Sequence, residues 1–232
     1  MYISGTKDVE FAAVPRDIHR AADLQRARRP APVACRILDV IFALSGLIFV
    51  APLMIVVAIA IKIQDGGPIF FGHSRIGYGG KSFRCWKFRS MVVDAEARLS
   101  ALLARDPEAR REWEADQKLR RDPRVTLLGR VLRVSSIDEI PQLFNVLRGE
   151  MSLVGPRPIV TAEVARYGRR FAQYCSVRPG ITGLWQISGR NDVSYRRRVA
   201  MDSVFATSLS LSLYLKILFA TVPAVMKREG SY

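Results

Sequence analysis

One long uncharged run stands out from the charge-rich remainder of this chain. Residues 40–61 contain no charged side chain over 22 positions. A straight helix of that length spans about 33 Å at about 1.5 Å per residue, close to the hydrocarbon thickness of about 30 Å. Length alone therefore predicts a membrane-spanning helix.

Pro52 lies in the middle of this run and offers a second arrangement. It lacks the amide that would donate to the carbonyl of Ile48, so we expect a bend there. Basic residues flank the run on both sides: Arg26, Arg28, Arg29 and Arg36 before it, and Lys62, Arg75, Lys81, Arg84, Lys87 and Arg89 after it. Positive flanks prefer the cytoplasm, and a re-entrant hairpin places both there whereas a span places one. The residues alone leave the hairpin and a kinked span open, because proline is tolerated in spanning helices.

The rest of the pattern predicts helices with a few short strands. An apolar run at 69–71, followed by glycines at 77, 79 and 80, predicts a hairpin or short strands. Residues 94–118 predict an exposed helix or helical pair that breaks near Pro107. Residues 125–146 have helical spacing interrupted at 135–141, and residues 205–226 suit a helix lying in the membrane interface.

Charge and composition narrow the class of ligand. The net charge is +15, from 36 basic and 21 acidic residues, which suits phosphates, anionic lipid or nucleic acid. A hydrophobic content of 49% argues against a disordered basic tail. Aromatic residues do not alternate with the basic ones as a base-stacking surface requires, so nucleic acid is not predicted as a partner. The combination indicates a membrane surface and phosphorylated ligands.

Cysteine and histidine are too few and too scattered for common metal sites. Cys35, Cys85 and Cys175 show no CxxC spacing, so neither a disulfide framework nor a structural zinc site is expected, and a reducing compartment is favoured. His19 and His73 are the two histidines, which excludes histidine-rich metal sites. Acid–base or nucleophilic chemistry therefore falls to carboxylates.

Asp138 and Glu139 are the strongest candidates for a catalytic or metal-binding pair of carboxylates. Adjacent acids at a helix start face different directions, so one can attack or hold a metal while the other handles a proton. The alternative is structural: Ser136 and Glu139 have the spacing of a capping box, and the helix dipole favours acids in a first turn. Both interpretations remain open on these residues alone.

Basic residues near the pair suggest a phosphate-binding site. Those close in sequence or placed at rigid or glycine-rich positions are Arg130, Arg133, Arg148, Arg157, Lys87, Arg89 and Arg190. Guanidinium and ammonium groups suit a diphosphate, although each one alone is an ordinary surface charge. No glycine-rich nucleotide fingerprint is present, which disfavours an ordinary kinase, NTPase or dehydrogenase.

A series of motifs in order resembles the monotopic bacterial phosphoglycosyl transferases, which start exopolysaccharide and O-antigen assembly. The resemblance covers about residues 34–232 and rests on Pro52 within the apolar run, Gly67-Pro68-Ile69-Phe70-Phe71, Arg75-Ile76-Gly77, Gly80-Lys81-Ser82-Phe83, Lys87-Phe88-Arg89-Ser90-Met91, Asp138-Glu139-Ile140-Pro141-Gln142, Leu153-Val154-Gly155-Pro156-Arg157-Pro158, Arg178-Pro179-Gly180-Ile181-Thr182-Gly183-Leu184-Trp185-Gln186 and Gly189-Arg190. Each motif alone is weak, and nine in register are specific.

The resemblance implies a ping-pong reaction between a UDP-hexose and polyprenol (undecaprenyl) phosphate. Asp138 would attack the β-phosphate, UMP would leave, and the aspartyl-phosphosugar would pass to the acceptor. Glu139 would assist the metal or deprotonate the acceptor, and both acids would bind Mg²⁺, which prefers one or two carboxylates plus phosphate oxygens. The residues implied to bind phosphate or nucleotide are Lys87, Arg89, Arg133, Arg157 and Arg190.

The resemblance also implies an α-rich α/β membrane protein on the cytoplasmic face of the bacterial inner membrane. The expected parts are a mobile basic arm at 1–33, a re-entrant helix at 34–65 bent near Pro52, a cytoplasmic catalytic domain at 66–204 and an interfacial helix at 205–232. Membrane lipid is an expected partner. The transferred sugar, the oligomeric state and the role of the arm stay open.

Two departures from the family pattern and two rival hypotheses accompany this interpretation. Many relatives have Ser-Pro at the bend where this chain has Ala51-Pro52, and tryptophans and an acid where it has Leu209, Ser212 and Tyr214.

One rival hypothesis is a bitopic membrane protein whose basic domain binds lipid or a partner. The other is an inactive scaffold of the same family.

Overall fold

The computed structural model describes residues 31–116, 119, 121–188 and 193–226. Within these residues the chain forms two compact units. The N-terminal unit contains Ile37–His73 and Arg84–Gly149. The C-terminal unit contains Ser74–Phe83, the described residues from Glu150 onward and residues 31–36.

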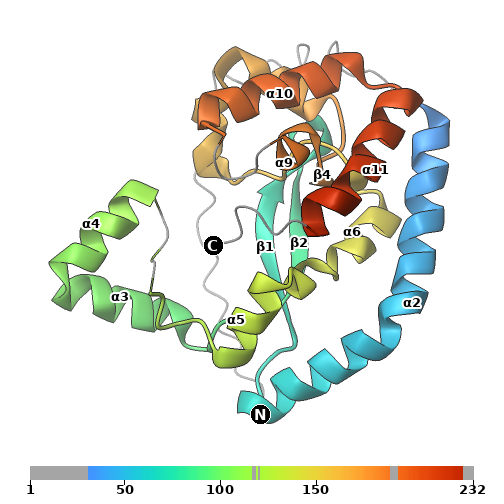
Figure 1. Ribbon diagram of the computed structural model, residues 1–232. Coiled ribbons are helices and arrows are strands. Elements are labelled where there is room, and N and C mark those ends of the chain that lie inside the picture. The colour runs from blue at the N-terminus through green and yellow to red at the C-terminus, as the bar shows by residue number, and fades with distance from the viewer. Residues whose placement is uncertain (1–30, 117–118, 120, 189–192, 227–232) are drawn as a thin grey trace. The chain divides into compact units, whose positions relative to one another are not determined.

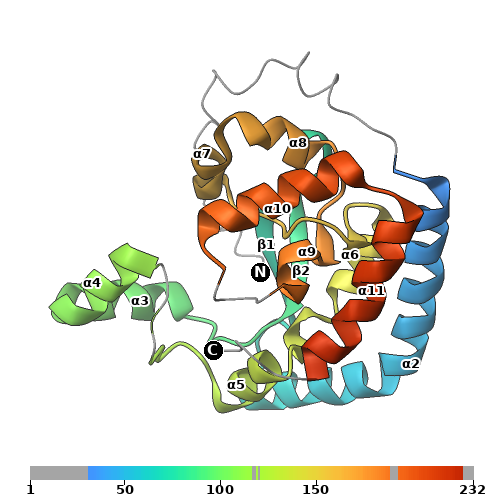
Figure 2. The same cartoon turned by 45° about the horizontal axis from the view of Figure 1, so that its top comes forward.

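The uncharged run lies in one long helix, α2 (Val33–Asp65). By length and composition α2 could cross a membrane, and only 11% of its most apolar window is buried, which distinguishes it from the core helix of a soluble protein. Pro52 lies inside it, and Figures 1 and 2 show the helix changing direction part-way along. The expected bend is present, as the missing amide of Pro52 requires.

The end of α2 is fixed by glycine and by charge. Gly66 adopts a positive φ of 67°, which glycine adopts at little cost, and its amide donates to the carbonyl of Lys62 at 2.9 Å. Lys62 Nζ donates back to the Gly66 carbonyl at 2.6 Å. A positive side chain in a last turn is favoured by the helix dipole.

The N-terminal unit is helical apart from its share of a hairpin. Its elements are α2, parts of the paired strands β1 (Phe70–Ile76) and β2 (Ser82–Phe88), α3 (Ala95–Arg105), α4 (Pro107–Asp116), α5 (Leu127–Val134), the 3-10 turn η3 (Ile137–Glu139) and α6 (Gln142–Arg148). The predicted break near Pro107 is confirmed: α3 and α4 meet at Asp106 and contact each other, as Figure 1 shows. The predicted hairpin is confirmed as well.

The second half of α2 belongs to the core of this unit. Val57 and Ile61 are buried in a cluster with Phe88 at the end of β2 and Leu132 of α5. Ile137 of η3 packs against the same cluster. The apolar helix therefore supports the segment that carries Asp138 and Glu139.

The C-terminal unit is built from short elements. They are η2 (Tyr78–Gly80), β3 (Ser152–Val154), η4 (Thr161–Glu163), α7 (Val164–Tyr167), η5 (Gly168–Arg170), α8 (Phe171–Cys175), β4 (Gly180–Thr182), α9 (Leu184–Ile187), α10 (Tyr195–Ser208) and α11 (Leu211–Met226). Helix α10 contacts α7, α8 and α9, and Figure 2 shows it lying beside α8. The core cluster includes Tyr167, Phe171, Tyr174 and Val199.

The two turn-rich stretches of the sequence form a parallel strand pair. Ser152 pairs with Gly180 and Val154 with Thr182. A side chain at Gly180 would place its Cβ 2.0 Å from the Gly155 amide nitrogen, a separation that real Cβ atoms do not show. Close backbone approach therefore requires glycine here.

The apolar segment at the end of the described chain is not one helix from Phe205. Phe205 belongs to α10, which ends at Ser208, and α11 begins at Leu211. Leu209 and Ser210 separate them, and Ser210 Oγ accepts a hydrogen bond from the Leu213 amide at 3.2 Å. Tyr214 of α11, one of the three positions that depart from the family pattern, is only 1% exposed.

Candidate functional site

Asp138 and Glu139 lie on η3, between α5 and α6. Ser136, directly before this turn, has a φ of 58° and is the one non-glycine residue with positive φ among those the structure describes. Such a conformation is strained for serine and is often found at functional sites.

The capping-box interpretation of this segment is wrong. The Ser136 side chain makes no capping hydrogen bond. The Glu139 side chain instead accepts a hydrogen bond from Lys87 Nζ at 2.6 Å. The acids are thus held by a cation from β2 and not by the start of their own turn.

Lys87 faces both carboxylates. Its Nζ lies 2.6 Å from Glu139 Oε1 and 3.6 Å from Asp138 Oδ2. Asp138 is the more buried acid, with 9% of its side chain exposed against 27% for Glu139. The two adjacent carboxylates therefore lie in different surroundings, as two distinct chemical roles require.

Burial raises the pKa of the Asp138 carboxyl above its ordinary value. The positive charge of Lys87 opposes this rise, the negative charge of Glu139 adds to it, and Arg133 opposes it. The two cations therefore offset part of the effect that burial has on the pKa of the Asp138 carboxyl.

Arg133 is held by a hydroxyl from the segment after β2. Its Nε donates to Ser90 Oγ at 2.8 Å. Gly129 of α5 makes this approach possible, because a Cβ there would lie 1.9 Å from the Ser90 carbonyl oxygen. Thr126 caps the start of α5 by accepting from the Gly129 amide at 2.9 Å. Close packing of α5 on Ser90 thus positions Arg133.

Arg89 contacts the end of α2. It forms an ion pair with Asp65 at the end of α2, and its guanidinium lies where a Cβ on Gly67 would intrude. Its Nε and Nη1 are buried with no hydrogen-bond partner among the described residues. Arg89 therefore joins β2 to the end of α2, and its contact with substrate stays a prediction.

The last two predicted phosphate-binding residues are not brought to the pair by these contacts. Arg157 is exposed on the loop after β3, in the C-terminal unit. Arg190 lies outside the described residues. Substrate binding by either residue stays a prediction.

The donor set at η3 fits a magnesium ion that takes most of its ligands from elsewhere. No group of three or more acidic, histidine or cysteine side chains gathers into a metal cluster within the described part of the chain. Mg²⁺ is commonly bound by one or two carboxylates together with substrate phosphates and water. Asp138 and Glu139 can supply that minimum.

Two polar residues of this unit were missed by the sequence analysis as parts of the site. Ser90 lies inside a quoted motif, but its pairing with Arg133 becomes visible only in three dimensions. Asn145 of α6 is fully buried; its Oδ1 accepts from the Trp86 amide at 3.0 Å and its Nδ2 donates to the Arg84 carbonyl at 2.7 Å. It fixes α6 to the strand that carries Lys87. A buried, fully paired asparagine has no signal in a single sequence.

Comparison with known proteins identifies relatives of this chain. The model of the family described as bacterial sugar transferase matches residues 31–228. The undecaprenyl-phosphate galactose phosphotransferase of Salmonella typhimurium is 49% identical over 206 residues, covering 89% of this chain and 43% of that protein. The exopolysaccharide production protein ExoY of Rhizobium meliloti is 48% identical over 200 residues, covering 86% of this chain and 88% of that protein. The UDP-glucose:undecaprenyl-phosphate glucose-1-phosphate transferase of Caulobacter vibrioides is 38% identical over 205 residues, covering 85% and 71%.

Proposed function

Because this chain belongs to the bacterial sugar transferase family, we propose that it transfers a sugar-1-phosphate from a UDP-sugar to polyprenol phosphate. The names of two relatives, from Salmonella and Caulobacter, describe transfer of this kind to undecaprenyl phosphate. The chain spans less than half of the Salmonella relative but 88% of ExoY. A role in the first membrane step of exopolysaccharide or related glycan synthesis follows from these likenesses.

The observation that carries the proposal is the buried carboxylate of Asp138 facing Lys87. An Oδ atom of Asp138 attacks the β-phosphorus of the UDP-sugar. The bond from that phosphorus to the bridging oxygen breaks, and UMP leaves with the electron pair. The product on the protein is an acyl phosphate that carries the sugar.

The second step returns Asp138 to its starting form. An oxygen of polyprenol phosphate attacks the same phosphorus, the bond between phosphorus and the Asp138 oxygen breaks, and the carboxylate is regenerated. In this proposal Glu139, which is more exposed than Asp138, takes the proton of a monoprotonated acceptor phosphate. Lys87 and Arg133 lie where they offset negative charge in both steps.

Magnesium would be held by Asp138 and Glu139, and when bound it would neutralise charge on the diphosphate. The chain's own residues perform the remaining work: they position the nucleophile, keep it ionised and shield it from water.

The bent helix α2 supports a re-entrant anchor on the cytoplasmic face of the bacterial inner membrane. A bend at Pro52 lets both basic flanks stay in the cytoplasm, which the positive-inside rule favours. The second half of α2 packs beneath η3 through Val57, Ile61 and Ile137. Such an anchor would keep the acidic pair near headgroup depth, where the acceptor's phosphate leaves the lipid.

The test is UMP release from a panel of UDP-sugars by the purified chain in detergent with Mg²⁺ and polyprenol phosphate. We expect turnover with one sugar and none in Asp138→Asn. The matched control is Asp94→Asn, which also turns an acid into an amide but alters an exposed pair with Arg98 on α3. Equal activity in both variants would contradict the proposal. Absence of UMP release by the folded wild-type chain with every UDP-sugar would favour the scaffold hypothesis.

A further inference from the structure

The C-terminal unit contains a pocket lined by four arginines that the proposed reaction does not use. The pocket has a volume of about 330 Å³. Arg166 of α7, Arg169 and Arg170 of η5 and Arg196 of α10 line it. This volume is near the lower end of the range for small-molecule binding pockets.

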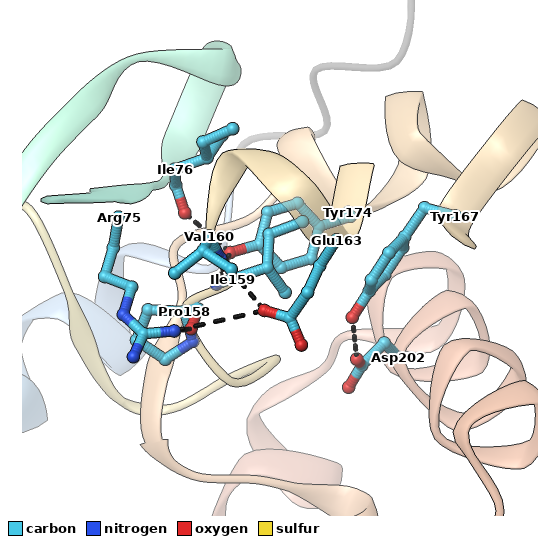
Figure 3. A network of polar contacts seen from close by, with 9 residues as sticks. All are labelled: Arg75, Ile76, Pro158, Ile159, Val160, Glu163, Tyr167, Tyr174 and Asp202. Atoms are coloured by element: carbon cyan, nitrogen blue, oxygen red, sulfur yellow. Dashed lines mark hydrogen bonds and ion pairs between the residues drawn. The ribbon is translucent and has the colours of Figure 1, made fainter. Parts of the chain in front are cut away.

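The charge of these arginines is not balanced within the described part of the chain. None of the four has an ion-pair partner there. Two carboxylates, Glu163 and Asp202, lie close enough to act on the pocket residue Tyr195, and each is also engaged by another group. Glu163 accepts from the Val160 amide at 2.9 Å and lies 3.9 Å from Arg75 Nη1, and Asp202 accepts from Tyr167 (Figure 3).

The inner wall of the pocket is rigid. Tyr167 and Val199 are buried core residues that also line it. The Tyr167 hydroxyl donates to Asp202 at 2.7 Å, and its ring meets that of Tyr195 edge-on at 6.3 Å between centroids. The Tyr167 ring also meets that of Tyr174 edge-on at 5.1 Å between centroids. The Tyr174 hydroxyl donates to the Ile76 carbonyl at 2.7 Å, as Figure 3 shows. The backbone that carries the arginines is therefore held by core packing.

One of the four arginines is itself held in place. The Arg166 guanidinium carbon lies 4.8 Å from the centre of the Tyr195 ring, a cation–π contact. Stacking on an aromatic face leaves the edge of a guanidinium available to acceptors. A preorganised arginine loses less freedom when it binds an anion.

We propose that this four-arginine pocket binds the phosphate or diphosphate group of a ligand distinct from the substrates at Asp138. Planar guanidiniums match phosphate oxygens with paired hydrogen bonds. Four unbalanced positive charges around one pocket favour an anion with more than one negative charge over a single carboxylate. The source of the phosphate is a soluble metabolite or a lipid headgroup, which share this chemistry.

Calorimetric titration of the whole chain in detergent with inorganic diphosphate tests the pocket. Arg196→Gln removes one lining charge, and Arg197→Gln is the matched control, because Arg197 is exposed on the same helix and does not line the pocket. We expect Arg196→Gln to weaken binding about tenfold, as the loss of one charge-assisted hydrogen bond does. Arg197→Gln should bind as the wild type does.

A third variant separates this pocket from the transfer site. Lys87→Met disables the acidic-pair site and should leave diphosphate binding at the pocket in place. Equal weakening in Arg196→Gln and Arg197→Gln would overturn the proposal, because it would mean a general effect of net charge. Loss of all diphosphate binding in Lys87→Met alone would overturn it too, because all the binding would then belong to the acidic-pair site, and the proposed transfer would stand.

Lipid nanodiscs identify the source of the phosphate. The same titration is run in nanodiscs of phosphatidylcholine alone and in nanodiscs that also contain phosphatidylglycerol. If a headgroup occupies the pocket, phosphatidylglycerol suppresses the titration in the wild type, and Arg196→Gln removes the difference. If the ligand is soluble, both nanodiscs titrate alike. Absence of pocket binding in both nanodiscs contradicts the proposal.

Discussion

Lys87 Nζ lies 3.6 Å from Asp138 Oδ2, an ion-pair distance that is longer than a good hydrogen bond. The short hydrogen bond of the ammonium goes to Glu139 instead. Lys87 therefore offsets the charge of the buried Asp138 while its closest contact is with the second acid. This division of contacts is compatible with the proposed attack of Asp138 on phosphorus.

Replacement of Lys87 should shift the pH dependence of transfer. Burial raises the pKa of Asp138 and Lys87 lowers it, so Lys87→Met should raise that pKa further. Because the proposed transfer needs the ionised carboxylate, the acidic limb of the UMP-release profile should move to higher pH. Lys81→Met, an exposed lysine in the turn before β2, is the control and should leave the limb in place. An unmoved limb in Lys87→Met would show that the two groups are not coupled.

The contact between Gly129 and Ser90 should be intolerant of a methyl group. A Cβ at Gly129 would lie 1.9 Å from a backbone oxygen, so Gly129→Ala should lower the free energy of unfolding by about 1–3 kcal/mol and disturb Arg133. Gly46→Ala is the matched control, because its Cβ would meet only Leu143 Cδ1 at an ordinary 3.6 Å. Chemical unfolding in detergent measures both variants. Equal stability of the two would refute the close packing of α5 on Ser90.

The bend of α2 should depend on Pro52. Pro52→Leu restores the missing amide, so the apolar run should straighten toward a spanning helix. Engineered cysteines at the two ends of the helix should be labelled from the same side in the wild type and from opposite sides in the variant. Same-side labelling in both would mean that Pro52 is not the deciding feature, and opposite sides in the wild type would favour the bitopic hypothesis.

Asp202 should make the C-terminal unit less stable as pH rises. Burial raises its pKa to about 7 from 3.8, so the folded state binds more protons than the unfolded state between these values. Its contribution to stability is complete below about pH 4 and is lost as the pH rises through about 7. Asp202→Asn keeps an acceptor for Tyr167 and should flatten this part of the profile. Thermal unfolding midpoints between pH 5 and 8 measure the effect, and identical slopes would rule it out.

Features that leave a local signal in the sequence were predictable. The absence of charge over residues 40–61 and the single Pro52 were enough to predict a bent apolar helix, because backbone chemistry at proline acts within one turn. Pro107 similarly marked the break between α3 and α4. The acidic pair was found as adjacent residues in a recognisable motif.

Features that depend on contacts between distant segments were not predictable. The spacing of Ser136 and Glu139 is that of a capping box, but Lys87, 52 positions away, takes the Glu139 carboxylate. The strands β3 and β4 are three residues each, too short to show a period, and they exist because Gly155 and Gly180 allow close approach. The four-arginine pocket combines residues from three elements, and each arginine alone resembles a surface charge.

The central claim is that Asp138 carries the sugar phosphate between donor and acceptor. The most direct measurement is the intact mass of the whole chain after incubation with its UDP-sugar and Mg²⁺ in the absence of polyprenol phosphate. We predict a mass increase of one sugar-phosphate group, mapped to Asp138 by fragmentation, absent in Asp138→Asn and removed when polyprenol phosphate is added. Sustained turnover by a chain that never gains this mass, or an adduct mapped to another residue, would contradict the account.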